Sequence, residues 1–119
     1  MTSNSAFAIH QPRASFTVTV IYHDPNGIDL RTLRDGNILA TGPNGFTASA
    51  EFVSANTRQH SSTIVATYAI HPPAGRWRQT NNGTYTLHLS GDSVEDRQGS
   101  AAAPAILGSF TINLATNDV

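Results

Sequence analysis

Two acidic segments contain the side chains best suited to hold a metal ion. They comprise Asp24, Asn26 and Asp29 in the first segment, and Asp92, Glu95 and Asp96 in the second. Calcium takes about six to eight oxygen ligands, often from loop carboxylates, but neither segment matches the EF-hand loop and each supplies too few oxygens alone. We therefore expect turn and cap residues here, with calcium bound by either segment as the alternative. No other cofactor is expected.

The single tryptophan, Trp77, lies between Arg76 and Arg78 in a polar stretch of sequence. An indole facing solvent there could stack on a sugar ring, with the two arginines beside it. Alternatively, the ring closes the open end of a β-sandwich and the arginines shield it. Burial of the large apolar ring favours this second arrangement. These three residues are the candidates for ligand binding.

The sequence has no arrangement typical of an enzyme. It contains no cysteine, which excludes disulfides, thiol nucleophiles and thiolate metal sites. No two of the histidines have the spacing of a metal-binding pair. Either Ser62 or Ser90 could meet a histidine and an aspartate in space, but neither lies in a nucleophile-elbow sequence. We predict that the protein has no catalytic residues and is not an enzyme.

Length and charge limit the function classes further. The 119 residues suit one domain, and only 13% of them are charged. The net charge is −1 and the basic residues are seven scattered arginines, which argues against nucleic-acid or lipid binding. No apolar run reaches the roughly 20 residues that span a bilayer. We expect a single domain over residues 1–119, with its core at about 7–115, cut from a larger exported protein.

Short runs of alternating apolar and polar residues, separated by turn sequences, predict an all-β sandwich of about seven strands. The expected strands are residues 7–10, 15–23, 37–41, 46–54, 63–71, 81–90 and 108–114. The spacing of Leu30 and Leu33 predicts one short helical turn near residues 29–35. The predicted buried face contains Val18, Val20, Ile64, Tyr68, Leu87, Leu89, Phe110 and Ile112. The predicted outer face contains Thr17, Thr19, Thr86, His88 and Thr111.

The most informative stretch is Asn81 to Leu89, where a turn-forming Asn-Asn-Gly leads directly into strict alternation. Tyr85 can bury its ring in the core while its hydroxyl bonds back to the preceding loop, as in the tyrosine corner of β-sandwiches. We therefore assign structural roles to Asn81, Gly83 and Tyr85. For Asp96 we expect a carboxylate that accepts hydrogen bonds from backbone amides before the last strand.

The order of these motifs resembles the bacterial Ig-like domains of S-layer proteins, surface adhesins and modular secreted hydrolases. The resemblance spans about Phe16 to Leu114. It rests on four motifs, namely Gly27 to Leu33, Asn82 to Leu87, Val94 to Gly99, and Phe110 to Ile112. It implies an Ig-like sandwich with Greek-key connections. Ser100 departs from the family, which usually has Asn there, and Leu87 stands where antibody domains have a disulfide cysteine, so an apolar core must supply the cohesion.

The resemblance implies a non-catalytic module of a secreted or cell-surface bacterial protein, acting as a structural spacer or adhesion element. Its partners would be neighbouring domains of the same polypeptide, and a polysaccharide or surface protein. The alternative is a carbohydrate-binding module of a secreted hydrolase, which would use Trp77 with Arg76 and Arg78.

Overall fold

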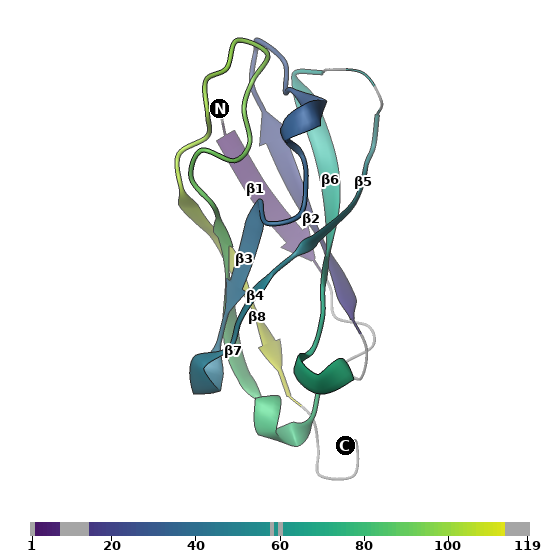
Figure 1. The fold of residues 1–119 in the computed structure, drawn as a ribbon, viewed down its shortest axis with the longest axis vertical. Coiled ribbons are helices and arrows are strands. Elements are labelled where there is room, and N and C mark those ends of the chain that lie inside the picture. The colour runs from purple at the N-terminus through teal and green to yellow at the C-terminus, as the bar shows by residue number, and fades with distance from the viewer. Residues whose placement is uncertain (1, 8–14, 58, 60, 114–119) are drawn as a thin grey trace.

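The computed structural model describes residues 2–7, 15–57, 59 and 61–113. They form two antiparallel sheets of four strands each, packed face to face (Figure 1). The first sheet has the order β1 (Thr2–Phe7), β2 (Phe16–His23), β6 (Thr63–Ile70), β5 (Glu51–Ala55). The second has the order β4 (Thr47–Ser49), β3 (Ile38–Thr41), β7 (Gly83–Leu89), β8 (Ala105–Ile112). The expected all-β sandwich is confirmed.

One segment of the chain belongs to both sheets. Only Ala50 separates β4, which pairs with β3, from β5, which pairs with β6. Counted as one strand that switches sheets, the segment brings the total in the described chain to the seven strands expected. In the lettering of immunoglobulin domains, the sheets read A-B-E-D and C′-C-F-G, which is the Ig-like strand order.

The predicted faces of the strands are correct. In the β2–β6 ladder, Val18 lies opposite Tyr68 and Val20 opposite Ala66, so all four side chains point into the space between the sheets. The eight residues predicted on the inner face are all buried, whereas those predicted on the outer face are partly or fully exposed. A slip of one residue in either strand would have exchanged the two faces.

Some element boundaries differ from the prediction. Strand β1 begins at Thr2, earlier than the predicted 7–10, of which residues 8–10 lie outside the described chain. Strand β8 begins at Ala105 instead of Gly108, and Leu114 also lies outside the described residues. The predicted helical turn is present as a 3-10 turn, η1 (Leu30–Thr32), which Asp29 caps by accepting a hydrogen bond from the Arg31 amide.

The outer edge of β5 is protected against pairing with another strand. The amide of Phe52 donates to the Asp35 carboxylate at 2.8 Å, and a bulge interrupts the strand between Phe52 and Ser54. Unpaired edge amides invite aggregation, and capping side chains and bulges are common ways to prevent it. Val53, at the bulge, is one of two large apolar side chains that the described chain leaves exposed.

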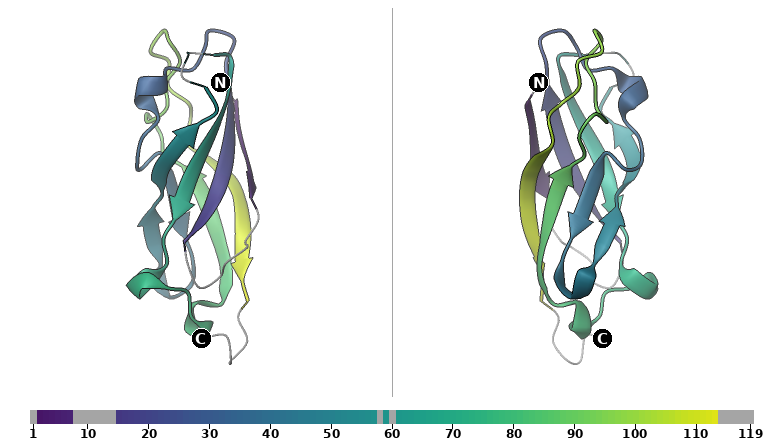
Figure 2. Two further views of the ribbon diagram at one scale, coloured as in Figure 1. Left: turned by 90° about the vertical axis from the view of Figure 1, so that its right-hand side faces the viewer. Right: turned by 60° about the vertical axis from the view of Figure 1, so that its left-hand side comes forward.

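The sandwich is elongated, with extents of 50 × 24 × 19 Å. Strand β1 begins at the end that carries η1, whereas β8 ends at the opposite end, beside η2 (Pro43–Gly45), η3 (Pro73–Gly75) and η4 (Gln79–Asn81) (Figures 1 and 2). We call these the upper and lower ends, as in Figure 1. No helix in the described residues is long and apolar enough to cross a membrane.

Candidate functional site

An aromatic cluster fills the lower end of the core. It consists of Phe46, Trp77, Tyr85 and Phe110. The Tyr85 ring stacks on Phe110 with centroids 5.0 Å apart, and meets Phe46 and Trp77 edge-on at 5.1 and 5.4 Å. These are favourable arrangements of aromatic quadrupoles, each worth about 0.5–1.5 kcal/mol beyond area burial. The cluster therefore closes the end of the sandwich with a fixed set of rings.

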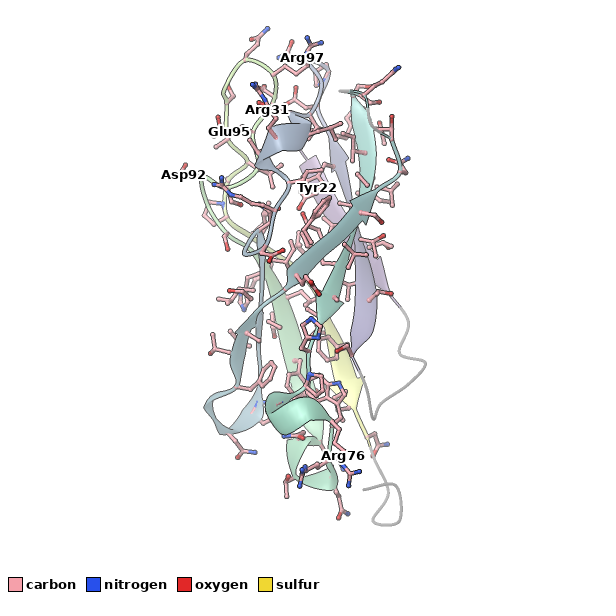
Figure 3. The ribbon with its side chains drawn as sticks, turned by 45° about the vertical axis from the view of Figure 1, so that its right-hand side comes forward. Tyr22, Arg31, Arg76, Asp92, Glu95 and Arg97 are labelled. Carbon is pink, nitrogen blue, oxygen red and sulfur yellow. The ribbon has the colours of Figure 1, made fainter. Side chains whose placement is uncertain are left out.

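The candidate ligand-binding residues divide between this cluster and the surface. Trp77 is 0% exposed and contacts Phe46 as well as Tyr85, so its indole offers no face on which a sugar could stack. Arg76 and Arg78 are exposed on either side of it, and Figure 3 shows Arg76 at the lower end. The ring therefore closes the lower end of the sandwich, which is the second arrangement considered above. The sugar-binding alternative depended on an indole that faces solvent, and Trp77 does not face solvent.

The tyrosine corner is present. The Tyr85 hydroxyl donates to the Asn81 carbonyl at 2.5 Å, while the Asn81 side chain accepts from the Arg78 amide at 2.8 Å. Gly83 begins β7 with φ +145°, a conformation that other residues rarely adopt, and a Cβ there would lie 2.9 Å from Pro43. The three residues together fix the loop between η4 and β7 to the aromatic cluster.

Sequence reasoning missed the role of Gly42 in the same cluster. Its φ of −162° is open to any residue, but a Cβ built there would lie 2.2 Å from Tyr85 Cδ2 and 2.4 Å from Cε2. Gly42 therefore serves close packing instead of turn geometry. The role could not be recognised from the sequence, because both glycines of Gly42-Pro43-Asn44-Gly45 are typical of a hairpin loop.

At the upper end, the two predicted acidic segments meet. Ile28 forms an antiparallel bridge with Asp96, the Arg97 amide donates to the Gly27 carbonyl, and the Asp29 amide donates to the Glu95 carbonyl. Figure 3 shows Glu95 and Arg97 at this end, near Arg31. The turn after β2 is thus joined by backbone hydrogen bonds to the loop before β8.

Asp96 organises this junction as expected. It is buried, and its Oδ1 accepts hydrogen bonds from the amides of Gln98 and Ser100, both at 2.9 Å. The Ser100 amide has the largest effect, and with Gln98, Asp24 and Asn26 it holds the pKa of the Asp96 carboxyl below its usual value despite burial. Ser100 therefore takes part through its backbone amide, and this hydrogen bond does not depend on which side chain stands at that position.

The residues considered for calcium do not assemble as either predicted set. Asp24 and Asn26 reach Asp96, which belongs to the other segment. Asp29 instead forms an ion pair with Arg31, with Oδ2 and Nη2 3.0 Å apart. Asp92 is an exposed turn residue with φ +58°. Within the described residues, no group of three or more His, Cys, Asp or Glu side chains is arranged to hold a metal ion.

We expect a chelator to leave the melting temperature unchanged. If calcium did bind, an excess of about a hundredfold over its dissociation constant would add roughly 2.7 kcal/mol of stability, or several degrees. Thermal melts with and without a chelator test this directly. A transition that falls by several degrees in chelator and recovers when calcium is added would contradict the prediction.

The Asp96 carboxylate should make stability depend on pH. Its pKa is lower in the folded protein than the usual value, so its contribution is complete above that value and is lost as the pH falls through the folded pKa. We expect Asp96→Asn to be less stable than wild type above about pH 5, and the difference to shrink below about pH 4.

Urea unfolding between pH 2 and 7 measures this difference, with Asp92→Asn as the matched control at an exposed position. A gap between Asp96→Asn and wild type that stays constant across the whole range would show that ionisation of Asp96 does not contribute.

A buried polar network crosses between the two sheets. The hydroxyls of Tyr22 and Tyr68 lie 2.8 Å apart, and Tyr68 donates to Asn37 Oδ1 at 3.0 Å. The Asn37 amide group in turn donates to the Thr32 carbonyl, and its Oδ1 accepts from the Arg34 amide. Burial raises the pKa of Tyr22 to about 12 and that of Tyr68 further. The network ties β2 and β6 to the segment that leads into β3.

Tyr68→Phe should destabilise the protein more than Tyr22→Phe does. The first change leaves the buried Tyr22 hydroxyl without its partner and costs about 1–3 kcal/mol, whereas the second leaves the Tyr68–Asn37 bond intact and costs about 0.5–1.5 kcal/mol. Urea denaturation of both variants measures the order. If Tyr22→Phe proved the more damaging change, the assigned order of hydrogen bonds, from Tyr22 through Tyr68 to Asn37, would be wrong.

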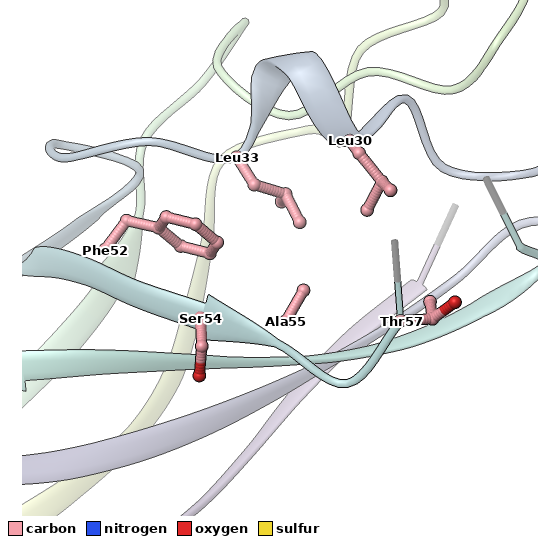
Figure 4. A pocket seen from close by; sticks show the side chains of 6 residues that line it. All are labelled: Leu30, Leu33, Phe52, Ser54, Ala55 and Thr57. Carbon is pink, nitrogen blue, oxygen red and sulfur yellow. The ribbon is translucent and has the colours of Figure 1, made fainter. Parts of the chain in front are cut away.

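A pocket of about 380 Å³ lies beside this network, between η1 and β5 (Figure 4). Leu30 and Leu33 form one wall, and Phe52, Ser54, Ala55 and Thr57 form the other. Both leucines and Phe52 also belong to, or pack against, the hydrophobic core. We assign the pocket no ligand.

A serine, a histidine and a glutamate meet at the surface, but not in the order of a catalytic triad. Ser15 Oγ lies 2.5 Å from His71 Nδ1, and Glu51 Oε1 lies 2.9 Å from His71 Nε2. In the serine hydrolase triad the nucleophile contacts Nε2 and the acid contacts Nδ1, the reverse of this arrangement. All three residues are exposed, and their hydrogen bonds connect the ends of β2, β5 and β6. We interpret it as a surface hydrogen-bond chain.

Comparisons of the whole chain with protein-family models, with curated proteins and with solved structures find no match.

Proposed function

We propose that the protein is a non-catalytic Ig-like module of the kind found in bacterial S-layer proteins, surface adhesins and modular secreted hydrolases, and that it serves as a structural spacer. One observation carries the proposal. The first described strand starts at one end of a 50 Å long sandwich and the last ends at the other, so consecutive copies can be joined end to end. The extended reach of such a chain is the property that a spacer needs.

Two further features support a stiff module. The aromatic cluster closes the lower end with contacting rings, and the Asp96 junction ties the upper loops together by backbone hydrogen bonds. Loops held in this way add little flexibility at the points where neighbouring domains would adjoin. The A-B-E-D and C′-C-F-G strand order and the tyrosine corner agree with the Ig-like assignment.

The proposed setting is a secreted or cell-surface bacterial protein, with neighbouring domains of the same polypeptide as the principal partners. An adhesive role toward a polysaccharide or a surface protein would use exposed residues such as Arg76 and Arg78. A carbohydrate-binding module stays the less favoured alternative, because the single tryptophan is buried in the core.

Small-angle X-ray scattering of two copies in tandem tests the spacer function. An end-to-end arrangement should give a maximum dimension close to twice the 50 Å length of one copy. The single domain measured in the same buffer is the control. A tandem protein hardly longer than one copy would mean that the domains fold back on each other, and would contradict the proposal.

A further inference from the structure

We infer that the domain resists tension along its long axis, with its two terminal strands loaded in shear. This inference goes beyond the spacer function, because a spacer needs only length and stiffness. It follows from the direction of β1 and β8 relative to the ends from which the chain would be pulled.

Strand β1 begins at the upper end and runs toward the lower end (Figure 1). It pairs with β2 in one uninterrupted register, from Thr2 opposite His23 to Phe7 opposite Val18. A force applied at Thr2, directed away from the sandwich, pulls β1 along its own axis. The ladder hydrogen bonds are perpendicular to the strands, so all the paired residues resist that movement together.

Strand β8 is loaded in the same way from the opposite end. It finishes at the lower end, where Ile112 pairs with Gly83 of β7, and the ladder runs in one register to Gly108 opposite Leu87 before a bulge shifts it by one residue. Strands β1 and β8 run in the same direction and contact each other across one side of the sandwich. Tension on the two ends therefore draws them in opposite directions along their length, which is shear and not peeling.

The two ladders should not be equally strong. In β8, the Phe110 ring stacks on Tyr85 and Ile112 is buried, so sliding this strand would pull two apolar side chains out of the core. The β1 sequence Thr-Ser-Asn-Ser-Ala-Phe contains a single large apolar residue. The β1–β2 ladder is therefore the part that yields first, and it sets the force at which the domain opens.

Single-molecule force spectroscopy in two pulling directions tests the shear geometry. The first attachment uses the chain ends, and the second uses the N-terminal end with a handle at Arg97→Cys, an exposed position at the upper end. Both handles of the second attachment lie toward the upper end, so Thr2 is no longer pulled out along β1, and the strand is peeled from Thr2, breaking pairs one after another. We expect the opening force between the chain ends to be at least about twofold higher. Equal forces in the two directions would overturn the proposal.

Disulfide locks identify the strand that yields. Because the chain has no cysteine, a pair can be placed across the β1–β2 ladder as Asn4→Cys with Ile21→Cys, or across β7–β8 as Thr84→Cys with Thr111→Cys. Directly opposed residues of antiparallel strands lie within disulfide reach. The first lock should raise the opening force and shorten the released chain by about 60 Å. The second should shorten it by about 95 Å with no change in opening force.

Reduction of each disulfide should restore wild-type behaviour, which controls for any effect of the substitutions themselves. If the β7–β8 lock alone raised the force, β8 and not β1 would be the strand that yields, and the assignment would be wrong. The force measurements concern a single domain and the scattering experiment concerns the arrangement of two. Either proposal can therefore fail while the other stands.

Discussion

Tyr85→Ala should lower the free energy of unfolding by about 3–5 kcal/mol, which is among the largest losses we expect from a single truncation in this chain. The Tyr85 ring contacts all three other members of the aromatic cluster. Its removal leaves a cavity bounded by Phe46, Trp77 and Phe110, and also breaks the hydroxyl bond to the Asn81 carbonyl. At a few degrees per kcal/mol, the melting temperature should fall by more than ten degrees.

Tyr85→Phe is the matched control for the corner. It keeps the ring and removes only the hydrogen bond to Asn81, so it should cost about 1 kcal/mol. Thermal melts monitored by circular dichroism measure both variants. Equal melting temperatures for wild type and Tyr85→Ala would show that the cluster does not hold the lower end together.

Gly42→Ala should be nearly as damaging, although it adds a single methyl group. That methyl would lie 2.2 Å from Tyr85 Cδ2, far inside van der Waals contact, and the ring is enclosed by its neighbours and cannot turn away. Overpacking of this kind costs about 1–3 kcal/mol and occasionally more, and we expect the upper end of that range. Urea denaturation provides the measurement.

Gly91→Ala is a suitable comparison, because that glycine also has no positive φ and its nearest neighbour to a new Cβ is Pro104 Cδ at 3.2 Å. It should change stability far less than Gly42→Ala does. In a Tyr85→Leu background, which lacks the clashing ring, the cost of Gly42→Ala should drop clearly. An unchanged cost would mean that the clash with Tyr85 is not its cause.

The strands were predictable where alternation was strong, and were missed where it was absent. Strands β2, β6 and β7 alternate apolar with mostly polar residues, with several large apolar side chains on one face, and this fixes both their existence and their inner face. Residues 2–6 are small and mostly polar, so no pattern marks β1, and it is a strand because the open edge of β2 supplies backbone partners. The change of sheet at Ala50 has no local signal either.

The sites were predictable where they depend on neighbours in sequence. The tyrosine corner joins residues four apart, and the Asp96 turn joins Asp96 to Gln98 and Ser100, so the sequence contained all the participants. The meeting of Asp24 with Asp96, and of Tyr22 with Asn37 through Tyr68, depends on how distant segments pack. In the sequence alone, these residues are far apart, and nothing indicates that they meet.

The switch at Ala50 has a consequence for how the chain folds. Because β4 and β5 are one continuous segment, neither sheet can complete its pairing without placing a strand in the other. A partly folded state with one finished sheet would leave that segment strained or unpaired, so we expect a single cooperative transition without a populated intermediate. The ladders also join residues far apart in sequence, which predicts folding in milliseconds to seconds instead of microseconds.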